Sequence, residues 1–336
     1  METLPPEIET MILVHLNGPE LVRYSTCSHL AFARASDTIS RHYCTRKLLD
    51  GFFSTDESYN AFRETQRRHG VLVSGSQVAG FFIRDGTTFK DSDLDVYVDI
   101  KRDIHLSGVL TQAGYFMHAD LSREHVIEPE DNELLAAMDD DEMILRTKYV
   151  LSAIASVKEY RNDEGKVVQV IASHGPPMDI ILGFHSTCVM NVISYHYAYC
   201  LYPSATISDR VSIAHIGTDT NSACARGKWA SRGWQMLREN TSSPRLDLRS
   251  VNRYVGDRYS WRIPCEGTLT VADVLQNNST RPTDPVKAHS WQLVYSCHFD
   301  DGFYAIYAWF LLPSFHEYIC ISNKIMRRIK ASMLTW

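Results

Sequence analysis

Residues 71–100 have the sequence VLVSGSQVAGFFIRDGTTFKDSDLDVYVDI, and this stretch decides the fold that the chain predicts. It begins with a short apolar run that ends at Ser74-Gly75-Ser76. Its last part, from Asp91 to Ile100, carries mostly acids at odd positions and apolar residues at the even positions from 94 onward. Alternation with period two predicts a half-buried β-strand. On such a strand Asp93 and Asp95 project from one face, roughly 7 Å apart at the backbone.

Two carboxylates on one face repel each other, and a divalent cation bound by both offsets that repulsion. Two cations held by one pair are the arrangement used in phosphoryl and nucleotidyl transfer. The preceding Gly75 lets the backbone approach a phosphate closely, and the Ser76 hydroxyl can donate to it. The alternative is an ordinary strand with a solvated polar face. A calcium loop is excluded because Val96 stands where that loop requires glycine.

The order strand, Gly-Ser, helix, then Ser-Asp-hydrophobic-Asp-hydrophobic resembles the nucleotidyltransferase superfamily, which includes polymerase beta. The matching residues are Val73 to Ser76, Gly80, and Ser92 to Val96, with a longer loop between the two halves than the family usually has. The resemblance implies an α+β fold with a nucleotidyltransferase-like mixed sheet flanked by helices. It also implies Mg²⁺ or Mn²⁺ held by Asp93 and Asp95 as catalytic residues, and an NTP bound by Gly75 and Ser76.

The next central strand of that family carries a third carboxylate, and this sequence departs from the pattern there. A hairpin is expected over 157–172, with its turn at Asn162-Asp163-Glu164-Gly165. Its second strand places Gln169 where the third acid belongs. An amide offers one carbonyl oxygen, but it neither neutralises two cations nor acts as a base. Asp179 could substitute only if the strand assignment is wrong, so the catalytic part of the resemblance is weakened.

Residues 1–45 predict a helical module with a first helix opening at Leu4-Pro5 and a second near Glu20. This module resembles an F-box, and the resemblance rests on Leu4, Pro5, Glu7, Ile8, Ile12, Leu13, Leu16, Glu20, Leu21 and Cys27. It implies docking to a Skp-type adaptor of a cullin ubiquitin ligase. The alternative is an amphipathic helix pair that packs on its own domain.

The remaining chain predicts a nucleotidyltransferase-like core over 46–240 and a β-containing C-terminal region over 241–336 that packs on it. Within the core we expect a helix capped by Ser54 with Glu57 and closed by Gly70. Another helix is expected over 222–237. It carries Arg226, Lys228 and Arg232, which either lie near bound phosphates or form a solvated basic face. A last helix is expected around 324–330.

Composition limits the function classes. The chain has 336 residues, a net charge of −6, and eight cysteines with no C-x-x-C pair, which argues against a disulfide framework or a zinc module. His185 and His196 lack partners at metal-ligand spacing, so we expect them to be structural. The acidic run at 128–142 is expected to be an insertion. Even when its charge is left out, the rest of the chain is not strongly basic, so nucleic-acid binding is not supported.

The N-terminus lacks the features of a signal peptide, and no stretch is a good membrane span, so a cytoplasmic or nuclear protein is expected. The glycosylation motifs at Asn240 and Asn278 would then be unused.

Two functions follow from these patterns. The first is a nucleotidyltransferase-fold protein that binds an NTP and Mg²⁺, and transfers a nucleotidyl group to a hydroxyl acceptor unless Gln169 has made it degenerate. The second is a non-catalytic substrate receptor, an F-box protein of a cullin ubiquitin ligase. The stretches Phe184 to Asn191 and Lys228 to Trp234 also resemble uncharacterised, largely fungal proteins with this core.

Overall fold

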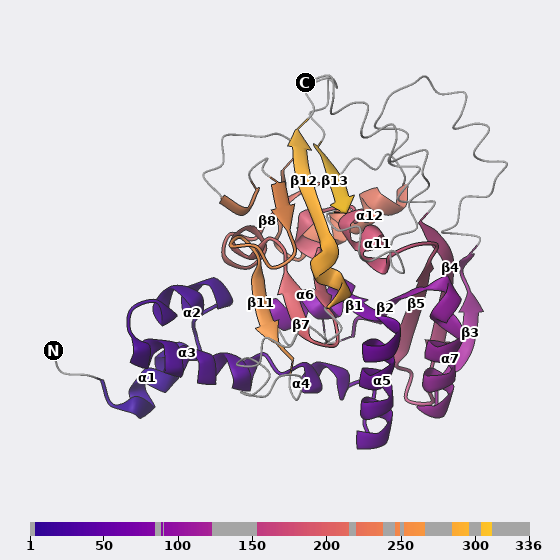
Figure 1. Cartoon of the computed structure of the whole chain (residues 1–336), viewed down its shortest axis with the longest axis horizontal. Coiled ribbons are helices and arrows are strands. Elements are labelled where there is room, and N and C mark those ends of the chain that lie inside the picture. The colour runs from indigo at the N-terminus through magenta and orange to yellow at the C-terminus, as the bar shows by residue number, and fades with distance from the viewer. Residues whose placement is uncertain are drawn as a thin grey trace.

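A mixed sheet of eight strands forms the centre of the computed structural model, in the order β11-β7-β6-β1-β2-β5-β4-β3. Only the neighbours β2 and β5 are parallel, and the other pairs are antiparallel (Figure 1). The structure describes residues 4–84, 89, 91–122, 153–214, 220–237, 246–248, 252–265, 284–295 and 304–310. The strands are β1 (Leu72–Ser74), β2 (Leu94–Asp99), β3 (Phe116–Asp120), β4 (Ile154–Arg161), β5 (Val167–Ser173), β6 (Asn191–Ile193), β7 (Tyr197–Cys200) and β11 (Trp261–Pro264).

Helices flank this sheet, as an α+β fold requires. The described helices are α1 (Pro6–Leu13), α2 (Gly18–Ser25), α3 (His29–His42), α4 (Thr45–Leu49), α5 (Asp56–His69), α6 (Gly75–Ile83), α7 (Asp103–Gln112), α11 (Pro177–Leu182) and α12 (Thr220–Ser231). Short turns of other helix types are η1 (Ile100–Arg102), η2 (Thr187–Val189), η3 (Ser204–Ser208), η4 (Leu246–Leu248) and η5 (Pro285–Ala288). The predicted α+β class is therefore confirmed.

Both faces of the central strands are covered. On β2, Val96 packs into a cluster with residues of α5, α6 and α7, while Tyr97 packs into a second cluster with α11 and β12 (His289–Tyr295). Successive strand residues point to opposite faces, so these two clusters lie on the two sides of the sheet. The prediction of a half-buried strand is confirmed at Asp95 and Asp99, which are partly exposed, and was wrong at Tyr97, which the second layer covers.

Local signals explain most element boundaries. The predicted hairpin is confirmed as β4 and β5, and Gly165 supplies the positive φ of 77° that its turn requires. Helix α5 ends at Gly70 in the left-handed conformation, as predicted. Its start differs by one residue: Thr55, and not Ser54, caps the helix, and the Thr55 hydroxyl accepts the Ser58 N–H at 3.1 Å.

The helix expected over 222–237 was too long. It ends at Ser231, and Gly233 follows with a φ of 97° that no helix continues. Residues Gln235–Leu237 instead form β9, which pairs in parallel with β8 (Val211–Ile213). Trp229 and Trp234 are both buried, one on each side of this break, and their rings meet edge to face at 5.0 Å.

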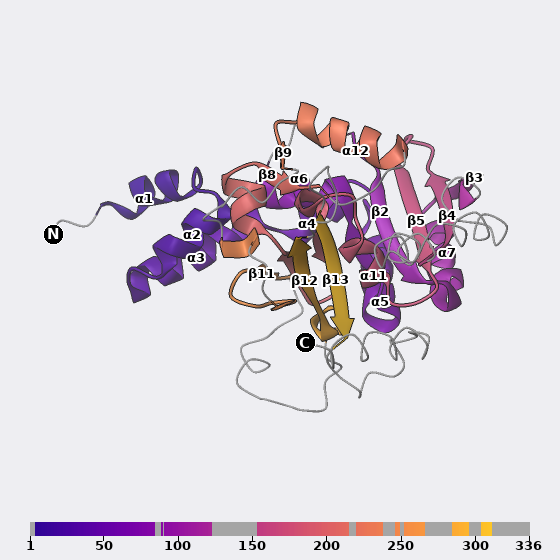
Figure 2. The ribbon, with the colours of Figure 1, turned by 90° about the horizontal axis from the view of Figure 1, so that it is seen from above.

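Helices α1 to α3 project from one side of the core (Figures 1 and 2). Among the contacts that hold them there, two involve Arg84 and Gly18. Arg84, just after α6, donates to the carbonyl oxygens of Val14 and Leu16 at 2.8 and 2.7 Å. Gly18 lies directly on the Trp261 ring, where an added Cβ would come within 2.0 Å of a ring carbon. The N-terminal helices are thus fixed to the sheet through Arg84 and β11.

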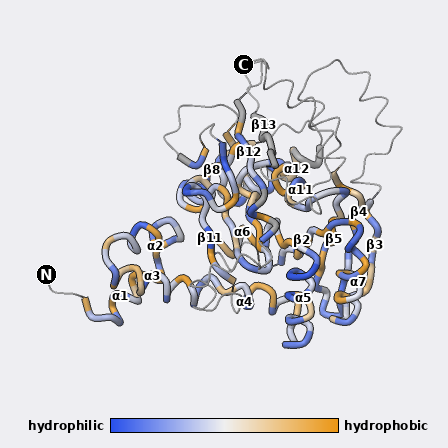
Figure 3. The backbone as a smooth tube through the Cα atoms, viewed as in Figure 1, coloured by the Kyte–Doolittle hydropathy of each residue, from blue (hydrophilic) through white to orange (hydrophobic). Residues whose placement is uncertain are grey.

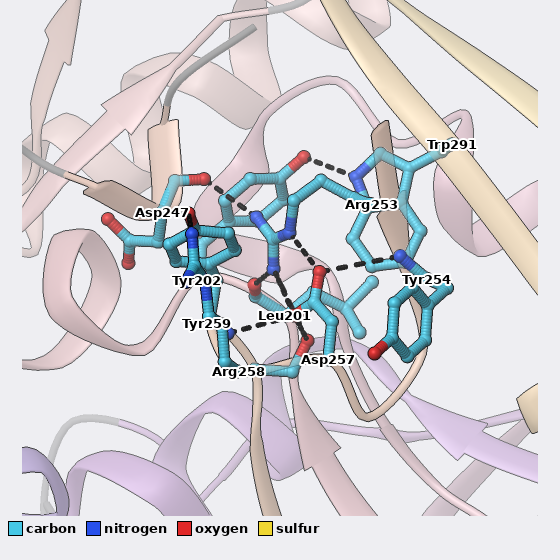
Figure 4. Close-up of polar contacts among 10 residues, drawn as sticks. Leu201, Tyr202, Asp247, Arg253, Tyr254, Asp257, Arg258, Tyr259 and Trp291 are labelled. Atoms are coloured by element: carbon cyan, nitrogen blue, oxygen red, sulfur yellow. Dashed lines mark hydrogen bonds and ion pairs between the residues drawn. The ribbon is translucent and has the colours of Figure 1, made fainter. Parts of the chain in front are cut away.

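The C-terminal region contributes to the same body. Strand β11 is an edge strand of the central sheet, and β10 (Asn252–Tyr254), β12 and β13 (Tyr304–Phe310) form a second sheet. Arg253 ties the two together (Figure 4). Its guanidinium is fully buried and pairs with Asp257 at 2.5 Å, and it donates to the carbonyl oxygens of Leu201 and Asp247, both at 2.7 Å.

Several sequence predictions lie outside the described residues: the acidic run at 128–142, the motifs at Asn240 and Asn278, and the helix at 324–330. Within the described part, no helix combines the length and the apolar character needed to cross a bilayer.

Candidate functional site

The sheet register brings the Gly-Ser turn and the acidic strand together. β1 and β2 are antiparallel, with Ser74 opposite Asp95. The chain leaves β1 at Ser74 and turns at once into α6, so Gly75 and Ser76 form the first turn of this helix beside the Asp95 carboxylate. The two halves of the motif, separated by 16 residues between Ser76 and Asp93, thus meet at one end of the sheet.

Asp95 packs directly against Gly75. A Cβ built on Gly75 would lie 1.8 Å from the Asp95 Oδ2 atom, so no side chain other than hydrogen fits there. Gly75 also has a φ of 75°, which disfavours any other residue. The backbone N–H of Ser76 donates to the Asp95 carboxylate. This carboxylate therefore lies at the N-terminal end of α6, where free N–H groups and the helix dipole favour negative charge.

Burial and mutual repulsion oppose ionisation of the pair. Desolvation and the neighbouring Asp93 raise the pKa of Asp95 to about 7. Desolvation, followed by the charge of Glu159, also raises the pKa of Asp93. The Ser76 N–H and the ammonium of Lys228 act in the opposite direction on Asp95 without cancelling the effect. A bound cation would remove this penalty, because it favours the charged form of both carboxylates.

Gln169 lies on the strand next to Asp95, as expected from the sequence. In the parallel pairing of β2 and β5, Gln169 lies opposite Asp95. Because this strand assignment is correct, Asp179 does not take the position; it lies in α11 and is buried there. Within the described residues no group of three His, Cys, Asp or Glu side chains is arranged to hold a metal ion. The structure thus brings together Asp93, Asp95, Gly75 and Ser76, with an amide beside them.

Glu159 is a site residue that the sequence analysis missed. It lies on β4 opposite Gln169, so Asp95, Gln169 and Glu159 follow one another across three adjacent strands. Its Oε1 accepts from Arg161 Nε at 2.7 Å. Alternation within the hairpin could have placed Glu159 and Gln169 on one face, but only the pairing register shows that they are neighbours.

One cation on α12 acts on the carboxylates, and a second cation just after the helix bonds to Ser76. Lys228 is exposed, and its positive charge partly opposes the rise in the pKa of both Asp93 and Asp95. Arg232 is half-buried and donates from Nη1 to the Ser76 hydroxyl at 3.2 Å. Figure 2 shows α12 on the outside of the core, beyond α6 and β2. Trp229 is buried and Lys228 is exposed, so the helix itself matches the alternative of core aromatics with a solvated basic face, while Arg232 just after it reaches Ser76.

His185 and His196, the two histidines considered as ligands, make hydrogen bonds to neighbouring serines. The Nδ1 atom of His185 hydrogen-bonds to the Ser186 hydroxyl at 2.8 Å, and the backbone N–H of His196 donates to the Ser194 hydroxyl at 3.2 Å.

In comparisons with known proteins, no protein-family model, curated protein or solved structure matches the chain.

The close contact between Gly75 and Asp95 makes a test of the site's construction possible. We expect Gly75→Ala to destabilise the fold by more than about 1 kcal/mol, since it adds both backbone strain and a clash. Gly108→Ala in α7 is the matched control, because its Cβ meets nothing within 4 Å. That control should stabilise the protein by about 0.5–1 kcal/mol. Urea unfolding of both variants measures the difference, and equal effects would contradict the contact.

The raised pKa of Asp95 predicts a pH-dependent effect of Asp95→Asn. Between about pH 4 and pH 7 the folded state holds a proton that the unfolded state has lost, so unfolding free energy falls as pH rises through this range. The neutral amide removes that loss. Asp95→Asn should therefore stabilise the protein more at pH 8 than at pH 5, as measured by thermal unfolding. Asp91→Asn, at an exposed position, controls for the lost charge, and an offset independent of pH would contradict the assignment.

Proposed function

We propose that the protein binds a nucleoside triphosphate together with Mg²⁺ or Mn²⁺, in the manner of the nucleotidyltransferase superfamily that it resembles. Asp93 and Asp95 would hold the cation, and Gly75 and Ser76 would bind the phosphates at the start of α6. The observation that carries the proposal is the Asp95 carboxylate packed on Gly75 at a helix N-terminus, with Asp93 beside it. Hard oxygen ligands of this kind suit a divalent cation and the phosphates that it accompanies.

A nucleotidyl transfer at this site would be slow. In such a reaction the acceptor hydroxyl oxygen attacks the α-phosphorus, the bond to the bridging oxygen breaks, and pyrophosphate leaves with the electron pair. The hydroxyl proton needs an acceptor, and the metals need enough negative charge around them. Gln169 opposite Asp95 supplies neither. Binding without efficient turnover is therefore the function that the geometry supports best.

Metal and nucleotide binding test this proposal directly. Electron paramagnetic resonance measures Mn²⁺ binding, and calorimetry measures each of the four NTPs with Mg²⁺. We expect the wild type to bind both, and the Asp93→Asn/Asp95→Asn double variant to lose more than about tenfold in metal affinity, since it removes both charged ligands. Asp91→Asn should bind like the wild type.

Transfer of labelled nucleotide is the second readout of the same experiment. Gln169→Asp should raise transfer above the wild-type level, because it restores a carboxylate opposite Asp95. If none of the NTPs binds in a metal-dependent way, the proposal fails.

A second candidate function is supported by the N-terminal helices. Their exposed apolar side chains include Met11 and Phe32, which are 64% and 60% exposed, together with Leu4, Ile8, Ile12, Val22 and Leu30. Apolar and polar residues alternate along these helices (Figure 3). Exposed apolar side chains gathered on one small unit are typical of a protein-binding surface. The F-box resemblance makes a Skp-type adaptor the partner we propose, with the core as the substrate-binding part of a cullin ubiquitin ligase.

Surface variants test this second function without disturbing the helices' anchors on the core. A Skp-type adaptor should co-purify with the wild type and not with Met11→Glu/Phe32→Glu, because a buried carboxylate is costly at an apolar interface. Phe116→Glu on β3 is the control, since Phe116 is an equally exposed aromatic residue elsewhere. Adaptor binding that survives the double variant would rule out this surface.

A further inference from the structure

Among the described residues, Arg232 is a partly buried cation that forms no ion pair with an acid. Within the described part of the chain no carboxylate forms an ion pair with it, and its hydrogen bond goes to the neutral Ser76 hydroxyl. Its guanidinium lies over the rings of Phe89 and Trp229, at 4.8 and 5.3 Å from their centres. Burial lowers the pKa of this group. Removing a charge from water without a counter-charge is unfavourable, so an anion at this position would stabilise the arrangement.

The aromatic rings also fix where the guanidinium points. Phe89 and Trp229 are buried in a cluster with Trp234 and Ala79 of α6, and Phe89 packs closely on Gly80 of that helix. Arg232 is therefore held as a flat group over rings that are themselves anchored to α6. One of its five N–H donors reaches Ser76, and a guanidinium fixed in this way suits two-pronged binding of a phosphate.

Lys228 adds a second positive charge on the same side. It precedes Arg232 by four residues and lies in the last turn of α12, while Arg232 follows the end of that helix. Its charge acts on both Asp93 and Asp95, yet it forms no ion pair with either within the described residues. The site thus has a negative half, Asp93 and Asp95, and a positive half, Lys228 and Arg232, with Ser76 between them.

We propose that Ser76, Lys228 and Arg232 form a subsite for the terminal phosphates of the nucleotide. The inference rests on the proposed function, because the carboxylates would hold the metal that bridges to the same phosphates. A ligand that satisfies both halves carries a divalent cation and several negative charges, which describes a metal-bound triphosphate. A nucleoside monophosphate reaches only one half, so the protein selects triphosphates over monophosphates.

Substitutions on α12 and just after it test the subsite. Arg232→Gln and Lys228→Gln should each weaken Mg·ATP binding, measured by calorimetry, by roughly tenfold to a hundredfold, the range for hydrogen bonds to charged groups. Binding of AMP, and of Mn²⁺ alone, should not weaken. Arg226→Gln is the matched control: it removes the same charge from α12, two residues before Lys228 and so on the opposite side of the helix. Equal Mg·ATP affinities for Arg232→Gln and Arg226→Gln would overturn the subsite.

Loss of folding is separated from loss of binding by thermal unfolding of every variant. Should Arg232→Gln unfold because it leaves the aromatic rings, Lys228→Gln carries the test, since Lys228 is exposed. Arg232→Lys, which keeps the charge but not the planar fork, should bind Mg·ATP more weakly than the wild type and more tightly than Arg232→Gln.

A metal-free arm distinguishes failure of the subsite from failure of the proposed function. Tripolyphosphate is added without metal to Asp93→Asn/Asp95→Asn, in which the metal ligands and their repulsion of phosphate are both absent. We expect it to bind, and to bind at least about tenfold more weakly when Arg232→Gln is added. If the wild type binds no Mn²⁺ but this dependence on Arg232 holds, the proposed metal function fails and the subsite stands. If tripolyphosphate does not bind, the subsite is wrong.

Discussion

The contact between the Asp95 carboxylate and Gly75 is the constraint on which the candidate site depends. It requires a residue without a side chain at the first position of α6, a positive φ at that residue, and the antiparallel register that sets Ser74 opposite Asp95. The N-terminus of α6 stabilises the charged Asp95 carboxylate through the Ser76 N–H, while burial disfavours that charge. The site is therefore built into the junction of β1, α6 and β2, and a change in any of these elements would displace the carboxylate.

This arrangement is the basis of our proposal that the site binds its ligand without efficient chemistry. Two carboxylates with raised pKa values provide a place where a cation is favourable, and Lys228 and Arg232 provide a place where an anion is favourable. Neither needs a third acid. Efficient transfer does need one, and the register places Gln169 there while Glu159 is one strand further away and hydrogen-bonded to Arg161. In our proposal, the site positions a metal-bound triphosphate and lacks a group that completes the reaction.

Local sequence patterns predicted much of the fold around the site, whereas the remaining features depend on contacts between distant residues. Alternation predicted the strand that the structure shows at Leu94–Asp99, and turn residues predicted the hairpin around Gly165. The expected place of Gln169 came from the family resemblance, and the register does set it opposite Asp95. The predicted cap of α5 was off by one residue because cap preference favours Ser54 over Thr55, whereas the structure forms the capping box between Thr55 and Ser58. The bond from Arg232 to Ser76 joins residues 156 positions apart, and no periodicity encodes it. The covered second face of β2 likewise depends on α11 and β12, which come much later in the sequence.

The most direct measurement is a crystal structure of the protein with Mn²⁺ and a non-hydrolysable NTP analogue, recorded with anomalous data at the manganese edge. The account predicts an anomalous peak coordinated by Asp93 and Asp95, with the triphosphate against Gly75 and Ser76 and its terminal phosphates near Arg232. A peak bound elsewhere, or an unoccupied site with Asp95 still on the Ser76 N–H under saturating Mn²⁺ and nucleotide, would contradict it.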